Sequence, residues 1–107
     1  MPNADITPAS PTRTIVCADS LPWMREHVPL AGACAVTSLP DVSEVNIPLS
    51  DWRVWFLDAV QLVVNSVADD SAALFFQSDI KRDGRWIDKG ALVTRAAEDA
   101  GAHILFH

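Results

Sequence analysis

Short apolar runs alternate with amphipathic stretches along the chain from Thr14 onward. The β-branched run 14–18 and the apolar runs 32–37 and 72–77 are typical of buried strands, and residues 102–106 begin a fourth. Apolar and polar residues do not alternate within these runs, which is the pattern of strands covered on both faces. The pattern therefore predicts a sheet that lies between layers of helices.

Three stretches have helical spacing. A short helix is predicted over 20–27, and the longest runs from about Leu49 to Val67 with Ser50 as its N-cap. Asp88 is predicted to cap a third helix, which Gly101 ends. The apolar positions of the longest helix are typical of a surface that faces the core: Trp52, Trp55, Phe56, Ala59, Val60 and Val63.

Strands that alternate with helices predict an α/β domain over residues 14–107, with a parallel sheet of about four strands and helices on both faces. The proline-containing residues 1–13 are predicted to form a flexible tail. In such sheets ligands bind beyond the carboxyl ends of the strands. The candidate site residues are therefore Asp19, the segment 38–41, and Ser78 with Asp79.

The charge balance limits the partners that this single small domain can bind. The 107 residues carry a net charge of -6, which disfavours a sequence-independent nucleic-acid clamp. The one cluster suited to a phosphate backbone lies beside Trp86, although a solvated turn around Gly84 is the favoured interpretation; it contains Lys81, Arg82, Arg85 and Lys89.

Cys17 and Cys34 lie in apolar runs without metal-ligand or redox spacing, so we expect reduced core cysteines and a cytoplasmic protein. The longest apolar stretch, 54–67, is broken by polar residues, and neither a membrane span nor a signal peptide is predicted.

Cofactor and metal signatures are sparse. The glycines are scattered and form neither a dinucleotide-binding GxGxxG nor a P-loop, and no GxSxG nucleophile turn is present. The three histidines, His27, His103 and His107, are too far apart in the sequence to indicate a zinc site, so no metal is assigned.

The tetrapeptide Ser38-Leu39-Pro40-Asp41 directly follows a predicted strand. It resembles the catalytic motif [DNS]PP[YFW] of S-adenosylmethionine-dependent amino-methyltransferases: Ser38 and Pro40 match, Leu39 replaces the first proline, and Asp41 replaces the aromatic residue. The resemblance implies that Ser38 and the Leu39 carbonyl accept hydrogen bonds from a target amino group, with Asp41 bordering its pocket. The same four residues are also an ordinary turn sequence.

The order of the segments extends this resemblance over roughly residues 14–107. Residues 17–21 are similar to the GDxLE-like strand end of permuted members of the family, in which an acidic residue, here Asp19, approaches the cofactor adenine. The family's tetrapeptide, helix, strand, helix and strand follow in the same order. Permuted members carry their glycine-rich cofactor loop after these segments, so the resemblance implies the N-terminal part of a longer, Rossmann-like enzyme.

The resemblance implies an enzyme that transfers a methyl group from S-adenosylmethionine to a nitrogen. The acceptor is a base of RNA or DNA or, as the acidic balance favours, a small molecule. Ser78 and Asp79 either line its pocket or cap the following turn. A missing C-terminal half or a homodimer would complete the site. The alternative is a non-catalytic α/β interaction domain derived from such an enzyme.

Overall fold

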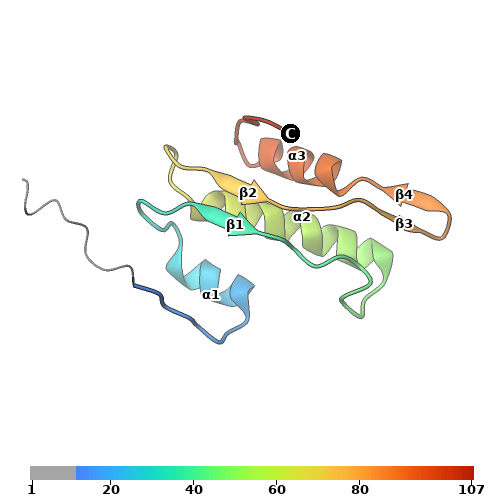
Figure 1. Ribbon diagram of the computed structural model, residues 1–107, viewed down its shortest axis with the longest axis horizontal. Helices are drawn as coiled ribbons and strands as arrows, with labels where there is room; N and C mark the ends of the chain where they lie inside the picture. The colour runs from blue at the N-terminus through green and yellow to red at the C-terminus, as the bar shows by residue number, and fades with distance from the viewer. Residues whose placement is uncertain (1–11) are drawn as a thin grey trace, which may run out of the picture.

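The computed structural model describes residues 12–107, and the predicted tail falls mainly on residues 1–11, outside this range. Parallel strands β1 and β2 pair Ala35 with Ala73, and an antiparallel pair, β3 and β4, forms a separate hairpin. Figure 1 shows the elements in chain order: α1 (Ser20–His27), β1 (Ala35–Thr37), α2 (Leu49–Ser66), β2 (Ala73–Phe75), β3 (Ile80–Arg82), β4 (Arg85–Ile87) and α3 (Lys89–Asp99).

Helix α2 supplies half of the buried hydrophobic residues. Trp52 and Phe56 are completely buried, and their ring centroids lie 4.9 Å apart. This confirms the prediction that the aromatic stripe of the longest helix packs inside. The other members of the same core cluster come from α2, α3, β4 and the loop after β1: Val42, Val60, Ile87, Leu92 and Ala96.

The helices lie where the sequence predicts them, because their end signals are local. Asp88 caps α3 by accepting a hydrogen bond from the Ala91 N–H at 2.8 Å. Gly101 ends the same helix with φ +88°, a conformation that glycine adopts without strain. Only the cap of α2 differs from the prediction, since the N-cap is Pro48 and Ser50 lies inside the helix.

The prediction of a parallel sheet of about four strands with helices on both faces is wrong. Residues 14–18 and 102–106 form no strand, and Ile15 is 92% exposed. An apolar run favours burial, but a strand also needs a neighbour with free N–H and C=O groups, which the run itself does not specify. Helix α2 packs against β1 on one face of the parallel pair, whereas Val36 is 63% exposed.

The structure also corrects two smaller predictions, one for the charged segment 81–86 and one for the burial of the cysteines. The charged segment 81–86 is a β-hairpin rather than only a turn, because Asp83 and Gly84 both have positive φ, the geometry of the two-residue turns that join twisted antiparallel strands. Cys17 and Cys34 are free, as predicted, but both are exposed and therefore lie outside the core.

Residues 12–107 were searched for a membrane-spanning helix and for a group of side chains that could bind a metal ion. No helix within residues 12–107 combines the length and hydrophobicity that a bilayer span requires. In the same part of the chain, His, Cys, Asp and Glu side chains form no group of three or more that could hold a metal ion.

Replacing Phe56 by alanine should test the role of the α2 core. We expect Phe56→Ala to lower the free energy of unfolding by about 3–5 kcal/mol, because it leaves a cavity against α3 and β4. Urea denaturation measures this change. Val54, 61% exposed on the same helix, gives the control Val54→Ala, whose effect should stay within about 0.5 kcal/mol. Equal losses for both variants would contradict this assignment of the core.

Candidate functional site at the strand ends

The ends of β1 and β2 meet at one edge of the parallel pair. The Phe76 N–H donates to the Thr37 carbonyl at 2.9 Å, immediately beyond the last strand pair. Gln77 then continues the pairing with its side chain. Its Oε1 accepts from the Leu39 N–H at 2.6 Å, and its Nε2 donates to the Leu39 carbonyl at 3.1 Å. The backbone of the tetrapeptide is therefore fixed at this edge by both the oxygen and the nitrogen of one side-chain amide.

A second hydrogen bond connects the tetrapeptide to the core. The indole Nε1 of Trp52 donates to the Pro40 carbonyl at 3.1 Å. Because the Trp52 ring is completely buried in α2, this donor has little freedom to move. The carbonyls of Leu39 and Pro40 are thus held in fixed positions at the end of β1.

Asp41 is the charged end of the tetrapeptide. Its Oδ1 accepts from both the hydroxyl and the backbone N–H of Ser43, and its Oδ2 lies 3.8 Å from the Lys89 ammonium. The hydrogen bond from the Ser43 hydroxyl, together with the other Ser43 bond and the Lys89 charge, lowers the pKa of Asp41 below its usual 3.8. The carboxylate is therefore ionised at neutral pH.

Lys89 links the two strand ends through α3. It is 3% exposed, and its backbone N–H donates to Asp79 Oδ1 at 2.9 Å. A cation in the first turn of a helix is unfavourable beside the positive end of the helix dipole. Asp41 and Asp79 offset this cost. The interpretation of Lys89 as part of a solvated basic turn is therefore wrong.

Most of the residues predicted to form a site lie at this edge. Ser38, Leu39, Pro40 and Asp41 follow β1, and Ser78 and Asp79 follow β2, with Ser38, Ser78 and Asp79 exposed. Asp19 does not join them. It caps α1 and accepts from the Leu21 N–H at 3.3 Å, and since residues 14–18 form no strand, it does not stand at a strand end.

The candidate site predicted from the sequence did not include three residues of this strand-end cluster: Gln77, Lys89 and Trp52. Gln77 carried a weak signal as the polar residue that ends an apolar run. Lys89 carried a stronger one, because a lysine directly after a helix cap needs a nearby carboxylate. Trp52 was assigned only to the core, and no sequence signal pointed to its bond with Pro40.

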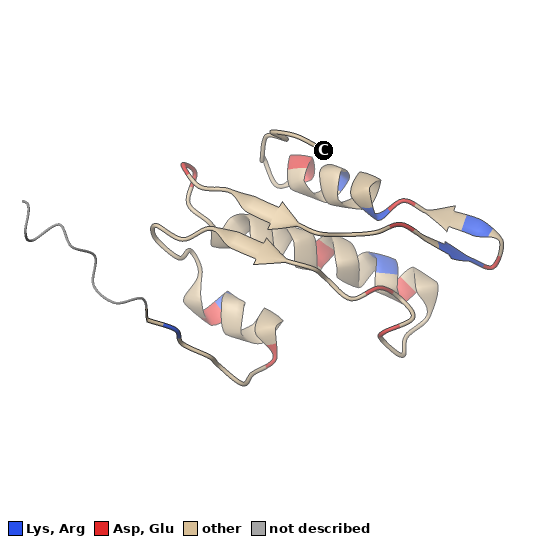
Figure 2. Cartoon of the chain, viewed as in Figure 1, with Lys and Arg blue, Asp and Glu red and all other residues tan. Residues whose placement is uncertain are grey.

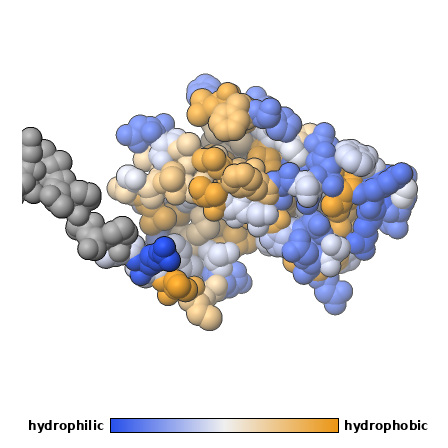
Figure 3. All heavy atoms as spheres, in the orientation of Figure 1, coloured by the Kyte–Doolittle hydropathy of each residue, from blue (hydrophilic) through white to orange (hydrophobic). Residues whose placement is uncertain are grey.

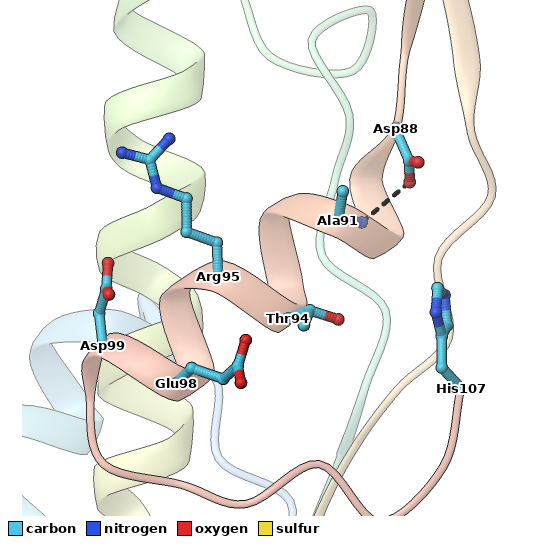
Figure 4. A pocket seen from close by; sticks show the side chains of 7 residues that line it. All are labelled: Asp88, Ala91, Thr94, Arg95, Glu98, Asp99 and His107. Carbon is cyan, nitrogen blue, oxygen red and sulfur yellow. Dashed lines mark hydrogen bonds between the residues drawn. The ribbon is translucent and has the colours of Figure 1, made fainter.

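Two surface hollows differ in their relation to this cluster. One, of about 340 Å³, is lined by Arg82 and by residues 42–47, which follow Asp41 in the chain. The other, of about 380 Å³, lies along the outer side of α3, where His107 faces the helix (Figure 4). It contains none of the predicted site residues. Its lining consists of Asp88, Ala91, Thr94, Arg95, Glu98, Asp99 and His107.

The described residues do not fit S-adenosylmethionine by themselves. A glycine-rich loop after a strand lets the backbone approach a nucleotide-like cofactor closely. None of the four glycines lies between β1 and α2 or directly after β2. Asp19, the residue expected to contact the cofactor, is engaged at the start of α1. What the strand ends do present is a group of hydrogen-bond acceptors: the Ser38 hydroxyl, two fixed carbonyls and the Asp41 carboxylate.

The lowered pKa of Asp41 predicts how stability depends on pH. Because the pKa is depressed in the folded state, the ionised group stabilises the fold above pH 3.8, and this contribution is lost as the pH falls through the folded-state pKa. We expect Asp41→Asn to be about 1–2 kcal/mol less stable than the parent at pH 7, with a gap that closes towards pH 2. Urea midpoints across this range measure the gap. The matched variant Asp69→Asn, in the exposed turn after α2, removes one carboxylate and controls for the change in net charge.

The double hydrogen bond of Gln77 predicts a local effect on the Leu39 amide. Gln77→Leu should cost about 1–3 kcal/mol and speed hydrogen exchange at Leu39, since it leaves both backbone groups without a partner. Gln77→Glu keeps the acceptor and should preserve more of the protection. NMR exchange rates, normalised to the Val60 amide in the core, measure both. Unchanged exchange at Leu39 in Gln77→Leu would show that the side chain does not fix the tetrapeptide.

Comparison with known proteins identifies no relative of this chain. No family model matches it, and neither a curated protein nor a solved structure does so. A function for the strand-end cluster is therefore supported by its own residues and geometry alone.

Proposed function

We propose that this chain binds and orients the acceptor amine in methyl transfer from S-adenosylmethionine to a nitrogen. The observation that carries the proposal is the fixed tetrapeptide at the strand ends. Its two central carbonyls are positioned by Gln77 and Trp52, and a charged carboxylate follows them. The exposed Ser38 hydroxyl precedes them at the end of β1. This arrangement suits a ligand that donates hydrogen bonds and gains positive charge.

The acceptors act on an amine in two ways. A carbonyl oxygen has two lone pairs, so Leu39 and Pro40 each keep one acceptor site beyond the bond that holds them. The two N–H groups of a neutral primary amine would donate to the Ser38 hydroxyl and to the Leu39 carbonyl, which would fix the direction of the nitrogen lone pair. As the nitrogen forms its new bond it becomes positive, and the nearby Asp41 carboxylate stabilises that charge.

The methyl donor of this proposal is S-adenosylmethionine, which supplies a methyl group on a positively charged sulfur. Residues 12–107 alone do not fit it, so further residues or a second chain would have to complete its site. The acceptor is an amine of a nucleic-acid base or of a small molecule.

One observation favours a second candidate, an interaction domain without catalysis. Val36 and Phe76, on β1 and directly after β2, are 63% and 64% exposed, and Leu105 and Phe106 are more exposed still. Figure 3 shows apolar residues gathered over the parallel pair, while the end of the molecule that carries the hairpin is hydrophilic. Apolar surface of this kind is common where another chain packs.

A methyl-transfer assay tests the first candidate. The protein from its native source, with any chain that copurifies, is incubated with tritiated S-adenosylmethionine and either single-stranded nucleic acid or small amines. We expect incorporation of tritium into an acceptor and a loss of roughly 10- to 100-fold in Ser38→Ala and Asp41→Asn, because each removes one stabilising contact. Ser50→Ala, an exposed serine inside α2, is the matched control.

Binding of the methyl donor separates the two candidates. Unchanged activity in Ser38→Ala and Asp41→Asn would reject the role of the tetrapeptide. If calorimetry detects no binding at millimolar S-adenosylmethionine, catalysis is rejected. A mass by sedimentation above that of one chain, reduced by Phe76→Asp, would then support the interaction domain.

A further inference from the structure

The β3–β4 hairpin has one face anchored in the protein and one face open. Ile80 pairs with Ile87, and these two pack against the core, with Ile87 only 3% exposed. Lys81 pairs with Trp86 on the opposite face, because side chains alternate between the faces of a strand. The hairpin is therefore held firmly by its isoleucines while it presents a lysine and an indole together.

The hairpin concentrates positive charge in an acidic chain. Residues 80–87 hold three of the eight Lys and Arg residues, Lys81, Arg82 and Arg85, against the single carboxylate of Asp83. Figure 2 shows these cations at the end of the molecule where the hairpin projects. Asp79 and Asp88 stand at the base, and each accepts a backbone N–H of α3. The carboxylates of Asp79, Asp83 and Asp88 balance the three cations over residues 79–88, so the excess of positive charge is confined to the outer part of the hairpin. The screening length at physiological salt is about 8 Å, which limits the influence of more distant carboxylates.

The indole of Trp86 is exposed to an unusual degree. It is 66% exposed, whereas Trp52 is completely buried. A flat aromatic ring beside several cations is the combination that single-stranded nucleic acids bind, since unpaired bases stack on the ring and phosphates contact the cations. A base in a duplex is already stacked on both sides and cannot use the ring in this way.

We propose that the β3–β4 hairpin binds single-stranded nucleic acid, with a base stacked on Trp86 and a phosphate at Lys81 on the same face, while Arg82 and Arg85, which alternation places on the opposite face, add to the positive charge near the turn. The hairpin begins directly after Ser78 and Asp79 of the strand-end cluster. If methyl transfer is the function, the acceptor is a base in a single strand. That second step rests on the proposed function, whereas the binding does not.

Fluorescence anisotropy with no methyl donor present tests the binding alone. The probes are fluorescein-labelled single strands of roughly 12 nucleotides, one of DNA and one of RNA with the same sequence, and a duplex of that DNA. We expect binding of the single strands, with log K falling against log salt at a slope of at least about 0.7 in magnitude, the value for the one phosphate contact at Lys81. Comparison of the DNA and RNA strands shows which of the two is preferred.

Variants separate stacking from charge. Trp86→Ala should weaken binding by at least about fivefold, while Trp86→Phe keeps a stacking ring and most of the affinity. Lys81→Ala should make the salt slope shallower by about 0.7, and Arg25→Ala, the same loss of charge on α1, should not change it. Thermal melts verify that each variant is folded.

Three results would overturn the proposal: no binding to either single strand at low salt, duplex binding as tight as single-strand binding, or equal effects of Lys81→Ala and Arg25→Ala. If Trp86→Ala lowers the oligomeric mass but leaves nucleic-acid binding unchanged, the indole contacts a protein instead. None of these measurements involves methyl transfer. Loss of the nucleic-acid binding proposal is therefore distinguishable from loss of the proposed function.

Discussion

Burial of one side of α2 is the constraint on which the rest of this structure depends. The two strand pairs have only three residue pairs each, and isolated two-stranded units are marginal in water. Trp52, Phe56 and Val60 provide what the strands lack, since full burial of a large apolar side chain contributes about 1.5–3 kcal/mol. Helix α3, the hairpin and the loop after β1 all pack against this one side.

The strand-end cluster is placed by the same packing. Trp52 is both a core residue and the donor that holds the Pro40 carbonyl. Ile87 lies in the core two positions before Lys89, so the anchored end of β4 determines where the Lys89 ammonium meets Asp41. The geometry of the polar cluster therefore depends on side chains that are packed in the core.

Features encoded within a short stretch of sequence were predictable. The spacing of apolar residues and the Asp88 and Gly101 signals gave the helices, because capping and amphipathicity involve neighbours in the chain. The tetrapeptide and Ser78 with Asp79 were found as polar residues that follow apolar runs. The pairing of β1 with β2 places these two segments at the same edge.

Features that depend on a distant partner were not predictable. The apolar residues around Ile15 and Leu105 indicated strands, but nothing in those runs says which edge would pair with them. The bonds of Gln77 to Leu39 and of Lys89 to Asp41 join separate parts of the chain and leave no local pattern. Binding of S-adenosylmethionine and methyl transfer stay predictions from resemblance.

The parallel pairing of β1 with β2 also has a consequence for the order of folding. It joins residues 38 positions apart through only three pairs, so closing that loop costs entropy that the pairs repay poorly. Helix α2 occupies most of the chain between β1 and β2. Once the helix has formed and packed, only the connections before and after it have to be ordered for the two strands to meet. The strands should dock after the helix, which makes the tetrapeptide one of the last parts to become ordered and among the first to open in local unfolding.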